Sequence, residues 1–141
     1  MQDLGRIVLN TIDRTKYVEV LTEFQTSDAT LISLEKKSFG VDSYEIGSAA
    51  AKLWKMPNII ISSIEDLSKP VNEQSPLGQI IGFAGVIAKF TGHGKQEPGT
   101  EERFEEYKTT LGLEIEDKKA FLALKDEKLK SNELYQFCST L

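Results

Sequence analysis

Histidine and cysteine are nearly missing from this chain of 141 residues, which contains one of each. Because Cys138 stands alone, the chain can form neither an intrachain disulfide nor a zinc site built from several thiolates, and the cytosol is its expected compartment. Because His93 is the single histidine, a metal centre with several histidine ligands is not expected either. A Ser-His-Asp triad is also not expected, since this histidine lies between two glycines.

An excess of basic residues and long apolar stretches are also missing. Lysine and arginine total 17 against 22 for aspartate and glutamate, which gives a net charge of −5. Nucleic acid is therefore not an expected partner, because its phosphates require a basic surface. No stretch reaches the roughly 18 consecutive apolar residues of a membrane span, and residues 1–3 lack the basic start of a secretion signal. We expect no membrane association, and the composition implies no cofactor.

Apolar residues are present in a pattern that predicts helices. Hydrophobic residues make up 40% of the chain and recur three or four positions apart, whereas the strict alternation of a strand is hard to find. We therefore expect an all-α fold, with residues 1–141 forming one helical bundle of about seven helices. The expected helices lie near 4–13, from 15, at about 28–37, from 42, from 57, at 77–90, from 100 and, as one helix or a pair, from 115.

Local signals indicate where these helices begin, end and pack. Asp42 and Glu45 have the spacing of a capping box, and Gly40 is a typical helix stop. Residues 77–90 are almost all apolar or small, so we expect this helix at the centre of the core. Residues 71–75 and 91–99 are expected to be loops, the second one mobile. The helix from 42 is expected to bury Ile46, Ala49, Ala50, Leu53 and, as a core anchor, Trp54.

Few side chains indicate chemistry. His93 shares its glycine-rich stretch with Lys95, but the spacing matches no phosphate-binding motif, so a solvated loop histidine is expected. Cys138 lies on the apolar side of the last expected helix, where a thiol packs as a small hydrophobe. The pair Glu65–Asp66 and the acidic cluster at 101–106 could coordinate a hard cation, but solvated helix faces are the favoured interpretation.

A series of short motifs runs through residues 35–70. Gly40 precedes Asp42 by two positions, Gly47 follows, and Trp54 and Pro57 have the spacing of a Trp-x-x-Pro corner. With these motifs the segment resembles the HDOD family, which is related to the HD phosphohydrolases. The resemblance extends more weakly over the full chain. The residues that match the structural motif of the family are Gly40, Gly47, Trp54, Pro57 and Pro70.

The chain departs from this family where relatives usually carry histidine. The first residues, with Asp3 and Arg6, resemble the family's His-Asp-(Ile/Leu)-Gly-(Lys/Arg) turn, but Gln2 replaces its histidine. Ser43 stands where a histidine usually follows the aspartate. Leu67 and Ser68 stand where relatives usually carry a pair of histidines. The resemblance therefore implies a vestigial metal site, and its candidate positions are Gln2, Asp3, Asp42, Ser43, Leu67 and Ser68.

The resemblance implies a function without catalysis. HDOD domains resemble signalling modules, so we expect a regulatory or protein-interaction domain of bacterial signal transduction, with a protein partner or an adjacent signalling domain. A metal-dependent phosphohydrolase of the wider HD superfamily is one alternative. A nucleotide sensor is another, with its pocket expected between residues 47–51 and 77–90. Family members usually have further helices before the His-Asp turn, which makes a C-terminal fragment or a shortened variant the expected origin of this chain.

Overall fold

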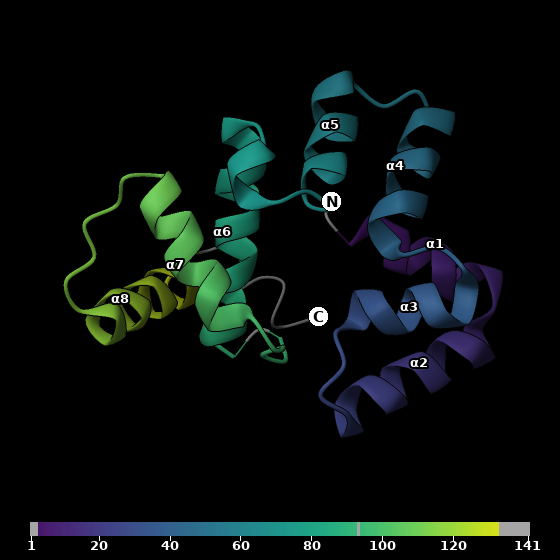
Figure 1. Cartoon of the computed structure of the whole chain (residues 1–141), viewed down its shortest axis with the longest axis horizontal. Coiled ribbons are helices and arrows are strands. Elements are labelled where there is room, and N and C mark those ends of the chain that lie inside the picture. Colours follow the sequence, from purple (N-terminus) through teal and green to yellow (C-terminus); the bar gives the residue numbers. More distant parts are fainter. Residues whose placement is uncertain (1–2, 93, 133–141) are drawn as a thin grey trace.

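The chain folds into helices joined by short loops, as a computed structural model that describes residues 3–92 and 94–132 shows (Figure 1). These residues form eight α-helices and one 3-10 turn, with no strand among them, so the all-α prediction is confirmed. The helices are α1 (Leu4–Ile12), α2 (Arg14–Thr26), α3 (Leu31–Phe39), α4 (Ser43–Leu53), α5 (Asn58–Asp66), the 3-10 turn η1 (Val71–Glu73), α6 (Pro76–Phe90), α7 (Thr100–Thr110) and α8 (Lys118–Lys130).

Local signals in the sequence place the end of α3 and the start of α4 correctly, whereas α3 begins at Leu31 and not near residue 28 as predicted. Gly40 ends α3 in the left-handed conformation with φ 77°, which costs glycine little because it has no Cβ. Asp42 and Glu45 form the predicted capping box at the start of α4. No described helix is long and apolar enough to cross a membrane.

The helices form two groups that meet between α5 and α6. In the first group, α4 packs against α1 and α5, and α2 packs against α3. In the second group, α7 packs against α6 and η1. Figure 1 shows α1 to α5 on one side of the molecule and α6 to α8 on the other. The space between the two groups is where the candidate site lies.

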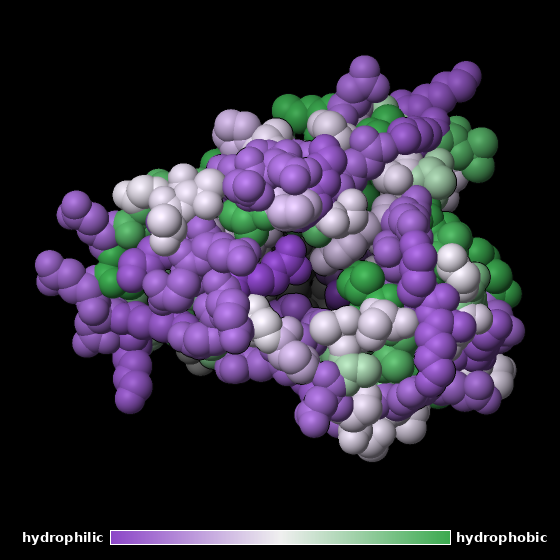
Figure 2. Space-filling view, viewed as in Figure 1, coloured by the Kyte–Doolittle hydropathy of each residue, from purple (hydrophilic) through white to green (hydrophobic). Residues whose placement is uncertain are grey.

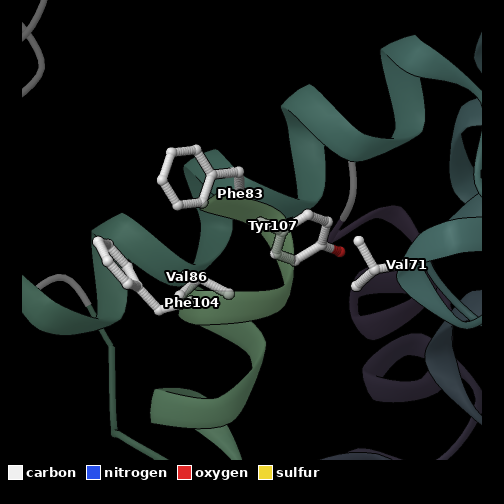
Figure 3. Packing of buried hydrophobic residues seen from close by; sticks show 5 residues of the cluster. All are labelled: Val71, Phe83, Val86, Phe104 and Tyr107. Carbon is white, nitrogen blue, oxygen red and sulfur yellow. The ribbon is translucent and has the colours of Figure 1, made fainter. Parts of the chain in front are cut away.

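Each group has its own cluster of buried apolar side chains. The first cluster joins α2 to α3 through Val20, Phe24, Leu31 and Leu34. The second cluster joins η1, α6 and α7, and Figure 3 shows the Tyr107 hydroxyl pointing toward Val71. Ile115 and Leu122 pack against this second cluster. The buried members of the second cluster are Val71, Phe83, Val86, Phe104 and Tyr107.

The predicted buried face of α4 is wrong. Trp54 is 54% exposed and Leu53 is 79% exposed, so neither anchors the core. The buried residues of α4 are small instead, with Gly47, Ser48 and Ala51 facing inward. The reason is the close approach of α1, whose backbone comes within reach of the backbone of α4 and leaves no room for large side chains there.

Two further expectations need correction. Helix α6 is not the centre of the core, because Ile80 is 58% exposed, and among the described elements α6 packs mainly against α5 and α7. Residues 71–75 are not a simple polar loop, since Val71 and Gln74 are buried and Gln74 accepts a hydrogen bond from the Tyr107 hydroxyl at 3.1 Å. The predictions for His93, for Cys138 and for the apolar residues after 132 lie outside the described residues.

Asp66 connects the two groups of helices. It is buried at the end of α5, and its carboxylate accepts hydrogen bonds from the Ser75 hydroxyl and from the Ser75 backbone N–H at 3.1 Å. The Lys69 ammonium lies 2.7 Å away. Burial alone would raise the pKa of Asp66, but the hydrogen bonds from Lys69 and Ser75 outweigh it and lower the pKa. Asp66 therefore stabilises the junction in its charged form.

This lowered pKa predicts a loss of stability in acid. A carboxylate with a depressed folded pKa contributes stability above its unfolded pKa, about 3.9 for aspartate, and loses it as the pH falls toward the folded value. We expect the free energy of unfolding of wild type to exceed that of Asp66→Asn at neutral pH, and the difference to shrink below about pH 4. Urea unfolding of both proteins from pH 7 to pH 3 measures this difference in the free energy of unfolding. The exposed Asp28→Asn serves as control, and an equal pH dependence in both variants would contradict this role.

Candidate functional site

A pocket of about 440 Å³ lies between the two groups of helices. Figure 2 shows a hollow at the centre of the face, between the side with α6 and α7 and the side with α3 and α4. Its walls come from the starts of α1, α3, α4 and α7, from the middle of α6 and from the α6–α7 loop. Residues from distant parts of the sequence therefore meet around one space.

Most of the positions expected to form a vestigial site lie around this pocket. Asp3, Asp42, Leu67 and Ser68 all line it. Ser43 does not line it: this residue is 1% exposed, and its hydroxyl has no hydrogen-bond partner among the described residues. Gln2 lies outside the described residues. The structure thus brings four of the six positions together, and their vestigial character stays a prediction.

The carboxylates of the pocket are already engaged by the protein. Asp42 accepts two hydrogen bonds through Oδ1, both at 2.9 Å, from backbone N–H groups at the start of α4. Asp3 pairs with Arg6 at 2.8 Å. Glu97 contacts Lys89 at 2.5 Å and accepts a hydrogen bond from the Leu31 backbone N–H at 3.2 Å. These bonds hold the carboxylates in structural roles.

The donor set does not fit a transition-metal centre. Such a centre needs three or more histidine, cysteine or carboxylate ligands converging on one point. Across residues 3–92 and 94–132, no group of three such residues is arranged to hold a metal ion. Two of the acidic residues considered for a hard cation are paired with lysines, Glu65 with Lys52 and Glu101 with Lys118, both at 2.5 Å.

Cations outnumber carboxylates on the pocket wall. Arg6, Lys89, Lys95 and Arg103 line it together with the three carboxylates. Lys95 donates to the Phe24 carbonyl and, at 2.7 Å, to the Ser27 carbonyl, so it ties the α6–α7 loop to the end of α2. The protein as a whole is acidic, with a net charge of −5. The pocket therefore has the opposite charge balance to the rest of the chain.

Tyr44 is half-buried on the pocket wall, and its hydroxyl is influenced by the charges of two of these cations. Burial raises the pKa of its hydroxyl, while the positive charges of Arg6 and Arg103 act to lower it. Neither Tyr44 nor Arg103 was among the site residues expected from the sequence. The spacing of charges along α7 gives no signal for Arg103, because only the packing of α7 against α6 brings this residue to the pocket.

The pocket is not where the sensor hypothesis placed it. The small residues at 47–51 do not line it, since Gly47 faces Gly5 and Ile64. The α4 wall consists of the first turn of that helix, and α6 contributes residues such as Gly82 and Val86. The α6 wall was thus predicted correctly and the α4 wall was wrong.

The residues of the expected structural motif have separate local roles. Gly40 ends α3, and Gly47 allows the close contact with α1. Pro57 and Pro70 directly precede α5 and η1, whose first backbone N–H groups need no partner within the helix. Trp54 ends α4 at the surface. None of the five lines the pocket.

A comparison with protein families identifies the first part of this chain. The model of the family described as "HDOD domain" matches residues 1–70. This half of the chain belongs to the HDOD family. No curated protein and no solved structure matches the chain. The match ends at Pro70, so the HDOD part supplies α1 to α5, whereas the pocket wall from α6 and α7 comes from residues beyond it.

Proposed function

We propose that this HDOD protein is a non-catalytic regulatory or protein-interaction domain of bacterial signal transduction, acting in the cytoplasm. The observation that supports it best is the state of the pocket carboxylates. Asp42 serves as a helix cap and Asp3 as the partner of Arg6, so neither is left to bind a metal or activate water. Its partner would be another protein or an adjacent signalling domain, whose activity the HDOD part modulates by contact.

A direct test compares this role with that of an HD-type phosphohydrolase. The purified protein is expected to contain less than stoichiometric transition metal and to leave bis-p-nitrophenyl phosphate intact, with or without added Mn²⁺. Elemental analysis and absorbance at the product wavelength measure the two quantities. Asp42→Asn is the matched variant, because asparagine is also a good helix N-cap and preserves the fold. Stoichiometric metal together with turnover that Asp42→Asn abolishes would overturn the proposal.

A small-molecule sensor is the second candidate, and the pocket favours it. A volume of about 440 Å³ lies within the range of ligand pockets. A sensor that binds its ligand in the folded state would melt at a higher temperature when the ligand is added. An interaction module without a ligand would show no such shift with any nucleotide.

A further inference from the structure

Arg103 is a cation without a counter-ion at the pocket. It lies in the first turn of α7, is exposed and lines the pocket wall. No ion pair or hydrogen bond joins its side chain to any other residue among 3–92 and 94–132, although Glu102 and Glu106 are its near neighbours on α7. Its guanidinium group therefore offers all its donors to a molecule in the pocket.

Arg6 and Tyr44 provide two further hydrogen-bond donors at the pocket. Arg6 contacts Asp3 through Nη1, which leaves other N–H groups of the guanidinium free for an acceptor. The Tyr44 hydroxyl makes no hydrogen bond within the described residues and experiences the charges of both arginines. Arg6, Tyr44 and Arg103 come from α1, α4 and α7, so three separate helices place donors on the wall of one pocket.

Helix ends add to the positive potential there. Helices α3, α4 and α7 all begin at the pocket, because Thr30, Asp42 and Thr100 line it. The start of a helix carries partial positive charge on its unpaired N–H groups. Thr30 and Asp42 cap their helices with side-chain oxygens, whereas Gly99 at the start of α7 gives no side-chain cap. The helix starts at the pocket that have no side-chain cap are thus those of α1 and α7, which carry Arg6 and Arg103.

We infer that this pocket binds a small phosphate-bearing molecule, with the phosphate held by Arg103, Arg6 and the Tyr44 hydroxyl. Arginine suits this role because its planar group donates two parallel hydrogen bonds to phosphate oxygens. The rest of the pocket, lined on the α6 side by residues such as Gly85 and Ala88, would hold the remainder of the ligand. The inference rests on the proposed regulatory function, since a regulatory domain retains its ligand unchanged.

Isothermal titration calorimetry with pyrophosphate, ADP and adenosine tests the site. We expect pyrophosphate and ADP to bind and adenosine not to bind. Arg103→Ala is expected to weaken binding at least about tenfold, because it removes charge-assisted hydrogen bonds, and Arg103→Lys is expected to weaken it less. Arg14→Ala is the matched control, since Arg14 is exposed on α2 and does not line the pocket. Thermal unfolding of each variant checks that it remains folded.

The outcomes separate the site from the proposed function. Binding that is lost in Arg103→Ala and kept in Arg14→Ala supports the site. Absence of binding by wild type, or an equal loss in both variants, overturns it while leaving the non-catalytic role in place. Binding of adenosine as strong as that of ADP also overturns it, because the phosphate would then contribute nothing. Hydrolysis of either phosphate probe, followed by ³¹P NMR, would instead overturn the non-catalytic function and leave the site standing.

Discussion

Replacing Gly5 with alanine is expected to lower the free energy of unfolding by about 3 kcal/mol or more, because overpacking here meets backbone atoms that cannot move aside. A Cβ on Gly5 would lie 1.7 Å from the carbonyl oxygen of Ser43 and 2.6 Å from its carbonyl carbon. Helices α1 and α4 would have to separate. Urea unfolding followed by circular dichroism measures the loss.

Gly94→Ala is the matched control for this prediction. A Cβ on Gly94 would lie 3.5 Å from Cγ of Lys89, which is ordinary contact with a flexible side chain. We expect a change within about 0.5 kcal/mol, typical of surface substitutions. Because Asp3 and Arg6 flank Gly5 and line the pocket, Gly5→Ala is also expected to weaken pyrophosphate binding. Equal stability of the two variants would show that α1 and α4 are not in the contact described.

The helix boundaries could be predicted because their signals are local. Asp42 and Glu45 cap α4 through bonds within one turn, and Gly40 ends α3 through its own backbone conformation. The buried face of α4 could not be predicted in the same way. The size of the side chains that this face can bury depends on how closely α1 approaches, and α1 lies some forty positions earlier in the chain. Because Leu53 and Trp54 are hydrophobic, they were predicted to be buried, although the contact between α1 and α4 admits only small residues.

The candidate site could be predicted on one side only. Asp3, Asp42, Leu67 and Ser68 were found because they belong to a segment that resembles a known family, and they do meet around the pocket. The opposite wall follows from the packing of α7 on α6, which no local pattern near Arg103 indicates. Charge could not reveal it either, because Arg103 stands among four glutamates of α7 in the sequence and meets the pocket only in three dimensions.

Glu35 shows how the fold holds the α4 side of the pocket in place. It is fully buried at 0% exposure, accepts a hydrogen bond from the Tyr17 hydroxyl at 3.1 Å and another from the Ser43 backbone N–H at 2.8 Å. One carboxylate thereby links α2, α3 and α4. Burial and the nearby Glu35 charge raise the pKa of Tyr17, so its hydroxyl stays protonated and keeps donating.

Glu35→Ala is therefore expected to destabilise the protein by about 3 kcal/mol or more, because two buried donors lose their acceptor at about 1–3 kcal/mol each. Tyr17→Phe leaves one oxygen of the Glu35 carboxylate without its donor but keeps the Ser43 bond, so it is expected to cost about 1–3 kcal/mol, less than Glu35→Ala. Glu19→Ala, on the exposed side of α2, changes the same charge and is expected to have little effect. Urea unfolding at pH 7 ranks the three variants.

Ser43→Ala gives the sharpest contrast, because it changes a side chain next to the Glu35 hydrogen bond without removing that bond. The Ser43 hydroxyl is buried and has no hydrogen-bond partner within residues 3–92 and 94–132, so its loss relieves an unsatisfied polar group and is expected to leave stability equal or slightly higher. The backbone N–H of the residue still donates to Glu35. A loss from Ser43→Ala as large as that from Glu35→Ala would mean that the hydroxyl, and not the backbone bond, connects α3 to the start of α4.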